Sequence, residues 1–382
     1  MIILAKITWL ALAALALAAT LLSGSLLSLA LLAALAGVPL LAAAVHLILR
    51  SRVKLRLSAP VNAAKGAQLT VQITAENPTA LPLPAIGVRV EIENLLTGEK
   101  QTVFRRTGAC PHRSGSAEIA LSSRFCGRVR ARAVSVRLYD CFWLLPVLCK
   151  AAASAAVTVQ PDVFPMEVSI LADTNCPDES EVYSQEKPGA DMTETFQIRD
   201  YREGDSIRQI HWKLSSKFDR LISRDPSLPV TRSVLLLWER KCEKTSPAEQ
   251  DAQAQSLVSL CRALLDQGAQ FNISWSEDGA GCVIQEIRDM GDLIGLLPRL
   301  LSAAPYAGGL SCAEALCRAA GEGVLSHIVY IAGTVPPEAA QLRSLGRVTA
   351  LVSGAQDALP EDIPVYAFDE SNCASQLMQL DI

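Results

Sequence analysis

The sequence has few of the residues and motifs on which many enzyme active sites depend. Only four of its 382 residues are histidines, and aromatic residues make up 5% of the chain. No segment reads GxSxG, GxGxxG, or GxxxxGK followed by Ser or Thr. The nearest approach to a phosphate-binding turn is the lone glycine of Ala332-Gly333-Thr334. These absences argue against serine hydrolysis of the α/β type and against a Rossmann or P-loop nucleotide site.

Cysteine is present, but in no pattern that binds a metal or builds a disulfide framework. The eleven cysteines are an odd number, with no CxxC pair and no histidine nearby at metal-ligand spacing. Free thiols in a reducing compartment are therefore expected. We expect no bound cofactor.

Charge is almost missing from the first 49 residues, where the ionisable side chains are Lys6 and His46. The apolar runs Ile7–Leu22 and Leu26–Leu49 are each long enough to cross a hydrocarbon core of about 30 Å. Ser23-Gly24-Ser25 between them suits a tight turn. Residues 1–49 are therefore predicted to form a two-helix membrane hairpin.

The charges that flank the hairpin predict its orientation. Lys6 precedes the first apolar run, and four cations follow the second, namely Arg50, Arg52, Lys54 and Arg56. Because Lys and Arg favour the cytoplasmic side, both termini are expected there, with a multi-pass anchor in the cell membrane. A cleaved signal peptide ending near Ala16-Leu17-Ala18 is the alternative, which the second apolar run disfavours.

Charge is also divided unevenly between the two parts that follow the hairpin. Residues 50–160 hold 16 Lys and Arg against 6 Asp and Glu, whereas residues 161–382 hold 18 against 33. Anionic headgroups would attract the basic part by on the order of 1 kcal/mol per well-placed cation. A nucleic-acid binder more often places its excess cations on a distal domain. The expected partners therefore include a lipid bilayer and no nucleic acid.

Residues 50–160 are predicted to form a basic, all-β sandwich. Apolar and polar residues alternate in four stretches separated by turn residues, at 53–57, 69–74, 87–92 and 128–138. Arg128, Arg130 and Arg132 alternate along the last stretch, so they are expected on one face of a strand. That face is either solvated or turned to lipid headgroups.

Residues 231–382 alternate between buried strands and helices. A continuous apolar run of strand length is found at 233–238, and further strands fit residues 270–275, 327–332, 348–352 and 364–368. Helical patterns occur at 247–267, 287–301, 312–320 and 372–380. This alternation indicates an α/β domain with a mostly parallel sheet covered on each side. Residues 161–230 between the two domains are predicted to be a linker and a charged segment.

That charged segment, residues 199–225, reads RDYREGDSIRQIHWKLSSKFDRLISRD. Asp205 is expected to cap a helix that starts at Ser206 and carries Ile207, Ile210 and Leu214 on one apolar face. Cations and acids are nearly balanced around it. Because arginine suits bidentate contacts with carboxylates, we predict a clasp of ion pairs that locks neighbouring modules together.

Two other readings of the segment stay open. An anionic ligand or a partner protein docks on its cations in the first. In the second, the chain is a hydrolase that uses His211, Asp205 and the surrounding arginines, with Ser215 as a neighbour of the histidine. A catalytic triad requires the acid to orient the imidazole and the imidazole to meet the hydroxyl. Nothing in the spacing enforces this, so we expect no enzyme activity.

The order of residues in the segment resembles the signature of the bacterial family catalogued as domain of unknown function fifty-eight. The matching residues are Arg199, Tyr201, Gly204, Asp205, Arg208, Ile210, Trp212, Lys213 and Ser215. The family usually has Asp at His211 and Ala at Ser216. Residues 139–144 also resemble its Asp-Pro-Phe-Gly-Leu motif, with Cys141 and Trp143 in place of Pro and Gly.

The resemblance implies two membrane spans, a β domain, and an α/β domain similar to von Willebrand factor A. It also implies an interaction or scaffold protein that accompanies a MoxR-type AAA+ ATPase and other membrane proteins in assembly or maturation of a membrane or secreted complex. Von Willebrand factor A domains hold a divalent ion with Asp-x-Ser-x-Ser after their first strand. Here Glu239, Lys241 and Glu243 stand at those places. Lys241 would put a cation where a hydroxyl should ligate, so we predict the fold without the ion.

Overall fold

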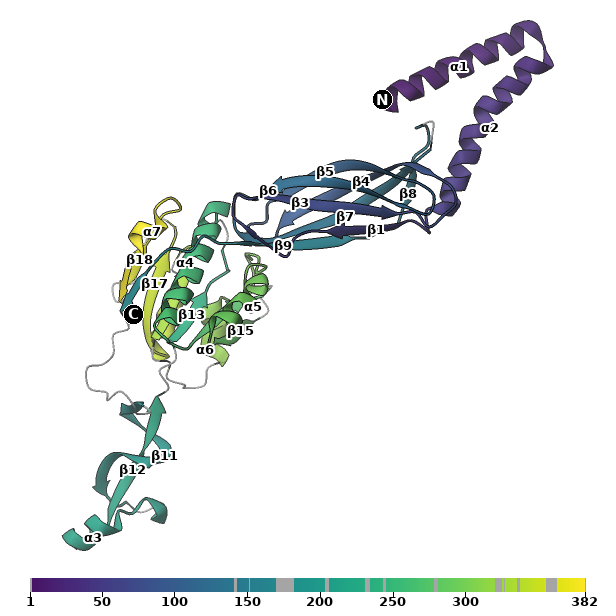
Figure 1. Cartoon of the computed structure of the whole chain (residues 1–382). Coiled ribbons are helices and arrows are strands. Elements are labelled where there is room, and N and C mark those ends of the chain that lie inside the picture. The colour runs from purple at the N-terminus through teal and green to yellow at the C-terminus, as the bar shows by residue number, and fades with distance from the viewer. Residues whose placement is uncertain are drawn as a thin grey trace. The chain divides into compact units, whose positions relative to one another are not determined.

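The chain divides into two compact units, residues 1–162 and 163–382. The computed structural model describes residues 2–381 apart from 141–142, 151, 170–181, 203–205, 231–233, 243–244, 278–280, 320–324, 326, 335–336 and 355–362. Two apolar N-terminal helices precede a β-rich body with several sheets (Figure 1), as predicted. Each unit is described by itself.

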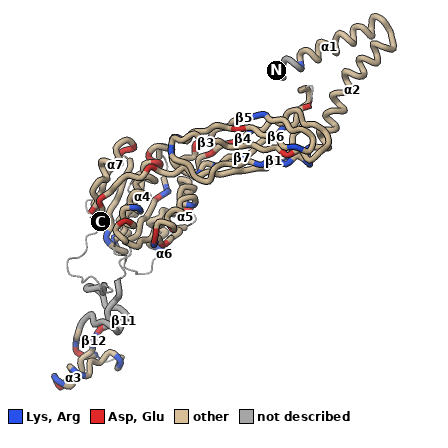
Figure 2. Tube along the Cα trace, viewed as in Figure 1, with Lys and Arg blue, Asp and Glu red and all other residues tan. Residues whose placement is uncertain are grey.

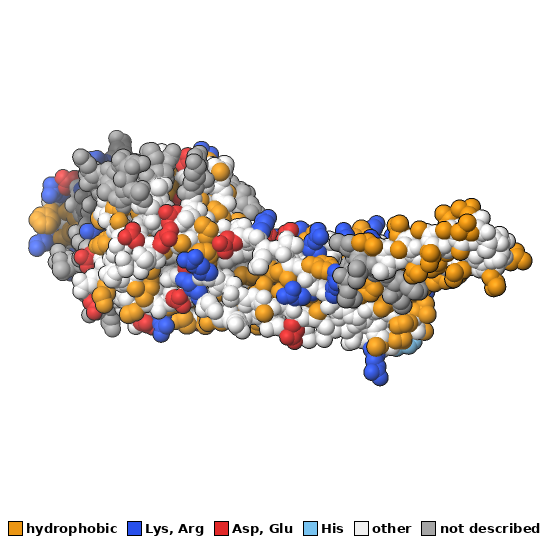
Figure 3. All heavy atoms as spheres, turned by 90° about the horizontal axis from the view of Figure 1, so that it is seen from above, with side chains coloured by type: hydrophobic (Ala, Val, Ile, Leu, Met, Phe, Trp, Pro, Cys, Tyr) orange, Lys and Arg blue, Asp and Glu red, His pale blue; other side chains and the backbone are white. Residues whose placement is uncertain are grey.

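The first unit begins with a helical hairpin, α1 (Ile2–Ser23) and α2 (Leu26–Leu49). Gly24 connects the helices with a φ of +57°, a conformation that glycine adopts without a steric cost. The Ser25 side chain caps α2 by accepting the Ser28 N–H at 3.3 Å. Figure 3 shows hydrophobic side chains covering the helices. Both helices are long and apolar enough to cross a membrane.

Two sheets form the sandwich that follows. Three strands make the first sheet, in the order β1 (Lys54–Ser58), β3 (Gln68–Glu76), β6 (Ser114–Ser122). Six make the second. Five of them follow the order β2 (Asn62–Ala64), β9 (Ser154–Gln160), β7 (Gly127–Tyr139), β4 (Leu83–Asn94), β5 (Lys100–Ala109), and the sixth, β8 (Val147–Cys149), pairs with β7. All pairs are antiparallel except β2 with β9.

The sandwich core is formed by the apolar residues of the alternating stretches. Ile73, Val88, Ile119 and Leu138 are fully buried, whereas the arginines between the core residues of β7 face outward. The core continues into the last turn of α2, since Leu49 belongs to the same cluster. The end of the second apolar helix is therefore built into the sandwich.

The second unit holds a six-stranded sheet. Its strand order is β15 (Cys282–Ile287), β14 (Phe271–Ser276), β13 (Val234–Trp238), β16 (His327–Ala332), β17 (Arg347–Val352), β18 (Val365–Ala367). All neighbours run parallel except β14 and β15. The described helical segments along this sheet include α4 (Pro247–Asp266), α5 (Met290–Leu300), α6 (Cys312–Ala319) and the 3-10 segment η2 (Pro337–Ser344).

Three predictions for this unit were wrong in part. The helix predicted from residue 287 starts at Met290, because residues 282–287 form the antiparallel edge strand β15. The helix predicted over 372–380 is the single turn α7 (Cys373–Gln376), followed by β19 (Gln379–Asp381). β19 pairs with β10 (Glu167–Ser169), so part of the predicted linker is a strand of this unit.

The charged segment belongs to an antiparallel pair of strands, β11 (Val182–Asp200) and β12 (Ile222–Val230), labelled in Figure 1. Between them lie the 3-10 turn η1 (Ile207–Gln209) and the helix α3 (Trp212–Phe218). We call residues 198–225 the signature arm. Gly204 and Asp205 lie outside the described residues.

Candidate functional site

The helix of the signature arm starts later than predicted. Ile210 forms an isolated antiparallel bridge with Ser223, so the chain is extended where a helix from Ser206 would pass. The helix α3 instead begins at Trp212, and His211 caps it by accepting the Leu214 N–H at its Nδ1 atom, 3.4 Å away. The predicted apolar face of Ile207, Ile210 and Leu214 is therefore not a face of one helix.

Buried polar bonds hold the signature arm together. The Ser215 hydroxyl donates to the His211 carbonyl oxygen at 3.1 Å and accepts the Ile222 N–H at 2.9 Å. The His211 N–H donates to the Ile222 carbonyl oxygen at 2.8 Å. Ser215 and Ile222 are both buried. These bonds join α3 to the start of β12, so Ser215 has a structural role in the arm.

The hydrolase reading gains no geometric support from these bonds. A serine nucleophile needs its proton directed at an imidazole nitrogen. Here the Ser215 proton is directed at a backbone carbonyl, and the His211 Nδ1 atom accepts a backbone N–H. Both side chains thus make hydrogen bonds to the backbone of the arm and not to each other.

Replacement of Ser215 by alanine is expected to destabilise the arm by about 1–2 kcal/mol, because the buried Ile222 N–H loses its partner. The measurement is hydrogen–deuterium exchange of the Ile222 amide, which should become faster by roughly tenfold. Ser216→Ala is the matched control, since Ser216 is exposed. Equal exchange in both variants would contradict the role given to Ser215.

Ion pairs lie within the described residues of the signature arm. The Arg199 Nε atom is 3.0 Å from the Asp225 Oδ2 atom, and Asp225 is buried. The Arg220 Nη1 atom is 3.1 Å from the Asp200 Oδ2 atom, with both side chains largely exposed. The first pair joins β11 to β12, and the second joins β11 to the turn before β12, so ion pairs of the predicted kind are present within the arm. A clasp between modules stays a prediction.

The remaining signature residues divide between the inside and the outside of the arm. Ile210 is buried, Tyr201 is half-buried, and its N–H donates to the Leu221 carbonyl oxygen. Arg208, Trp212 and Lys213 are exposed, and the Trp212 side chain keeps 62% of its surface open. Exposed Phe218 and Leu221 add apolar surface near the same helix. A large aromatic that its own segment leaves open is a candidate contact for a partner.

A second candidate site lies where β13 ends. The Glu239 side chain is 5% exposed and turns into the protein. Its Oε1 atom accepts the Lys241 N–H at 2.8 Å, and its Oε2 atom accepts the Cys312 N–H at 2.8 Å. The Tyr330 hydroxyl donates to Oε2 at 3.3 Å. Both carboxylate oxygens are therefore already occupied by donors of the chain.

These bonds bear on the predicted ion-free site. Burial raises the pKa of the Glu239 carboxyl, and the N–H groups of Lys241 and Cys312 hold it lower than burial alone would. A divalent ion bound to Glu239 would have to displace these donors. Glu243 lies outside the described residues. Among the residues that the structure describes, no group of three His, Cys, Asp or Glu side chains is placed to hold a metal.

Two cysteines lie beside the Glu239 site. The Cys282 sulfur is 2.7 Å from the Ser274 hydroxyl, and a hydrogen bond from the Cys312 side chain lowers the pKa of the Cys282 thiol. The hydrogen bond with Cys282, together with burial, raises the pKa of the Cys312 thiol. The described histidine of this sheet, His327, begins β16, whereas Glu239 follows the end of the parallel strand β13. An acid–base pair for cysteine chemistry is thus not assembled from these residues.

A buried cation follows Glu239. Arg240 is 2% exposed, and its guanidinium carbon lies 4.5 Å from the centre of the Trp238 ring. Its Nε atom donates to the Ala303 carbonyl oxygen at 3.1 Å, and Nη2 donates to the Gln250 Oε1 atom at 3.4 Å. The residues Trp238, Glu239 and Arg240 therefore tie the sheet to its flanking segments.

The sequence pointed to Glu239 but missed the residues that surround it. Tyr330 comes from β16 and Cys312 from the start of α6, far away along the chain. No local motif joins these positions. A general signal exists all the same, since the first residues of a helix offer free N–H groups to a carboxylate.

The motif resembling Asp-Pro-Phe-Gly-Leu forms a turn at the end of β7. The Asp140 Oδ1 atom accepts the Leu144 N–H at 2.8 Å, and the Asp140 carboxyl is fully buried. Trp143 has a φ of +61°, where a side chain costs about 1–2 kcal/mol and glycine costs little. Glycine, which stands at this place in the motif that residues 139–144 resemble, would adopt the same conformation at little cost. Cys141 lies outside the described residues.

Comparisons with known proteins do not assign the chain to a family. No family model matches the chain, and no curated protein matches it. A CARDB domain from Pyrococcus furiosus, solved with two metal ions, covers 28% of this chain and 87% of its own, with 15% identity and a TM-score of 0.22. A PapD-like domain of human CEP192 covers 29% and 86%, with 10% identity and a TM-score of 0.21. Likenesses of this size carry no argument about function.

Proposed function

We propose that the chain is a membrane-anchored, cytoplasm-facing interaction protein of the family catalogued as domain of unknown function fifty-eight, with a metal-free α/β domain similar to von Willebrand factor A. The two apolar helices supply the anchor. The mostly parallel sheet that starts at β13 is compatible with such a domain. The family is proposed from the resemblance of residues 199–215 to its signature. The protein works by binding, and a hydrolase is the alternative.

The observation that carries this proposal is that buried residues stabilise the signature arm while Trp212 stays exposed. Buried Ser215, Ile222 and Asp225 hold it together, while the signature tryptophan points its surface outward. Packing does not require Trp212 to be aromatic, because 62% of its surface is open. An exposed tryptophan is typical of the residues that contribute most to binding at a protein interface.

The partner that fits best is the MoxR-type AAA+ ATPase implied by the signature, bound through an acidic surface with an apolar pocket. Lys213 and Lys217 lie on α3 with Trp212 and are exposed, so the helix presents a ring beside positive charge. Complementary charge would speed association and make it depend on salt. Together the two proteins would act in assembly or maturation of a membrane or secreted complex.

Replacement of Trp212 by alanine is expected to weaken binding of the MoxR-type ATPase from the same organism by at least about tenfold, because a hot-spot tryptophan contributes roughly 2 kcal/mol or more. The full chain in nanodiscs is titrated with the purified ATPase, and binding is followed by surface plasmon resonance. Ile294→Ala is the control, since Ile294 is a similarly exposed apolar side chain on α5.

The same variant separates this proposal from the clasp. Its melting temperature should stay within about 1 °C of the wild type, since truncating an exposed side chain has little effect on stability. A clear fall in melting temperature without loss of binding would favour the clasp between modules. Equal binding by Trp212→Ala and wild type would refute the proposed role of Trp212.

A further inference from the structure

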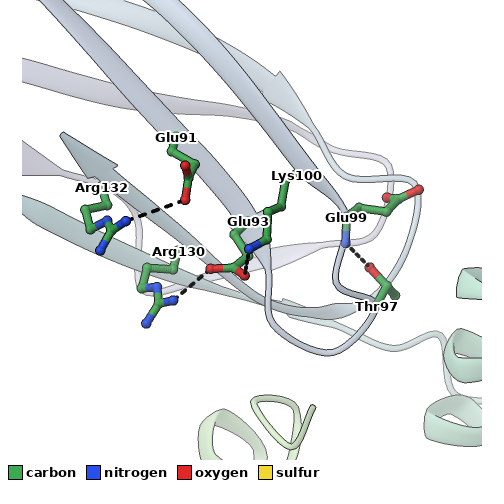
Figure 4. A network of polar contacts seen from close by, with 7 residues as sticks. All are labelled: Glu91, Glu93, Thr97, Glu99, Lys100, Arg130 and Arg132. Atoms are coloured by element: carbon green, nitrogen blue, oxygen red, sulfur yellow. Dashed lines mark hydrogen bonds and ion pairs between the residues drawn. The ribbon is translucent and has the colours of Figure 1, made fainter. Parts of the chain in front are cut away.

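The outer face of the six-stranded sheet of the sandwich carries some cations that are paired with carboxylates and others that are not. Arg130 on β7 lies 2.7 Å from Glu93 on β4, and Arg132 lies 3.8 Å from Glu91. Lys100 also pairs with Glu93, at 3.0 Å. Figure 4 shows these side chains pointing toward one another across neighbouring strands. The two carboxylates offset most of the charge of these three cations, which weakens the idea that Arg130 and Arg132 face lipid headgroups.

The other half of the same face keeps its positive charge. Arg89, Arg106 and Arg137 are exposed, and no described carboxylate lies within ion-pair distance of them. Strand pairing places Arg106 and Arg137 in one row, on either side of Gly87. Neighbouring strands lie about 4.8 Å apart, so roughly 10 Å separates the two backbones, a distance that two arginine side chains can bridge around one phosphate.

Aromatic rings fix one of these cations in place. The guanidinium carbon of Arg106 lies 5.2 Å from the centre of the Phe104 ring, 5.2 Å from that of Trp143 and 6.0 Å from that of Tyr139. Gly87 makes room for this arrangement, since a Cβ atom there would come within 2.8 Å of the Phe104 ring. The exposed Arg106 is thus held by stacking, which leaves its N–H groups available to an anion.

Strand β8 connects this row to the end of the apolar hairpin. Leu148 on β8 is paired with Arg137, and the next residue, Cys149, donates from its sulfur to the Arg50 carbonyl oxygen at 2.8 Å. Arg50 directly follows α2, whose 24 residues span about 36 Å, more than a hydrocarbon core. The end of α2 therefore lies at the level of the headgroups, with the arginine row close by. Exposed Leu148 adds an apolar contact there.

We propose that the face formed by Arg89, Arg106 and Arg137, framed by Phe104, Trp143 and Leu148, binds the phosphate headgroup of an anionic phospholipid. The inference rests on the membrane anchorage of the proposed function. The unpaired arginines supply the charge complementarity, and the direct link to the end of α2 makes the face continuous with the bilayer surface. An aromatic ring beside cations at this depth is the usual composition of a membrane interface. The bound lipid would fix the sandwich against the membrane.

The test compares two double variants that remove the same charge from the same face. Full-length chain in detergent is titrated with phosphatidylglycerol or phosphatidylcholine, and bound lipid is counted by native mass spectrometry. Arg106→Gln/Arg137→Gln is expected to bind phosphatidylglycerol about tenfold more weakly than the wild type. Arg130→Gln/Arg132→Gln, whose arginines are already paired, should bind it like the wild type. Neither variant should change binding of phosphatidylcholine.

A third variant covers the case that the first does not fold. Trp143→Gly removes the ring but relieves the positive φ, so its melting temperature should not fall while its affinity for phosphatidylglycerol falls about threefold. Equal losses in the two arginine variants, or a loss in none of the three, would overturn the proposal. Carbonate extraction of native membranes tests the anchorage separately, and binding of the ATPase is not needed for either result.

Discussion

Replacement of Glu239 by alanine is expected to lower the free energy of unfolding of residues 163–382 by about 3 kcal/mol or more. The carboxylate accepts the N–H groups of Lys241 and Cys312 and the hydroxyl of Tyr330, all in a buried site. Each donor left without a partner in such a place costs about 1–3 kcal/mol. Urea unfolding followed by the fluorescence of buried Trp238 and Trp275 measures the change.

The glutamine variant tells whether the charge of Glu239 is required as well as its shape. Both side-chain oxygens accept a backbone N–H, so the amide group of a glutamine must face one donor in either orientation. Glu239→Gln is therefore expected to destabilise the unit as well. Glu286→Ala is the control, because Glu286 pairs with Arg288 on the exposed surface of the edge strand. A fully stable Glu239→Gln would contradict this account.

The same site predicts the response to a divalent cation. Since the two oxygens of Glu239 are already bonded, millimolar Mg²⁺ is expected to leave the melting temperature of the wild type unchanged. A ligand that binds only the folded state raises its stability in proportion to the logarithm of its concentration. A rise in melting temperature with Mg²⁺ would show that the prediction of an ion-free site is wrong.

Elements with a strong local pattern could be predicted from the sequence. The helix predicted at 247–267 is α4, where Ser246 and Glu249 cap each other reciprocally and Gly268 ends the helix with a φ of +72°. The alternation along β7 likewise gave its buried and exposed faces. In both cases the deciding residues lie within a few positions of one another, so the sequence contains the whole signal.

Elements that depend on distant partners could not be predicted in this way. β19 is a strand because it pairs with β10, more than 200 residues earlier. In the signature arm the sequence favours a helix that starts after Asp205. The bridge between Ile210 and Ser223 keeps the chain extended there, so α3 starts after His211 instead. A local reading has no access to that bridge.

The candidate sites show the same limit. The sequence singled out Glu239 and the signature arm, because both follow recognisable local patterns. It offered no reason to prefer Arg106 and Arg137 over Arg130 and Arg132, since it does not tell which residue of the neighbouring strand lies opposite each arginine. Only the pairing of the strands shows that Glu91 and Glu93 lie opposite Arg132 and Arg130, while Gly87 lies opposite the other two.

Acidification is expected to destabilise the second unit as the pH falls from about 6.5 to about 4, because of His327. Burial, with a smaller effect of Arg347, lowers the pKa of His327 to about 4. An unfolded histidine titrates near 6.5, so over this range the unfolded state takes up a proton that the folded state refuses. The stability lost by pH 4 is on the order of 2–3 kcal/mol.

The variant His327→Gln tests this assignment. The His327 Nε2 atom lies 3.0 Å from the Thr349 hydroxyl on the neighbouring strand, and an amide can make a similar contact without titrating. Its melting temperature between pH 7 and pH 4 should therefore fall less steeply than that of the wild type. His112→Asn is the control, because His112 is exposed in the first unit and asparagine tolerates its positive φ. If the wild type and His327→Gln lose stability in parallel, His327 is protonated inside the folded protein and its burial does not govern the response to acid.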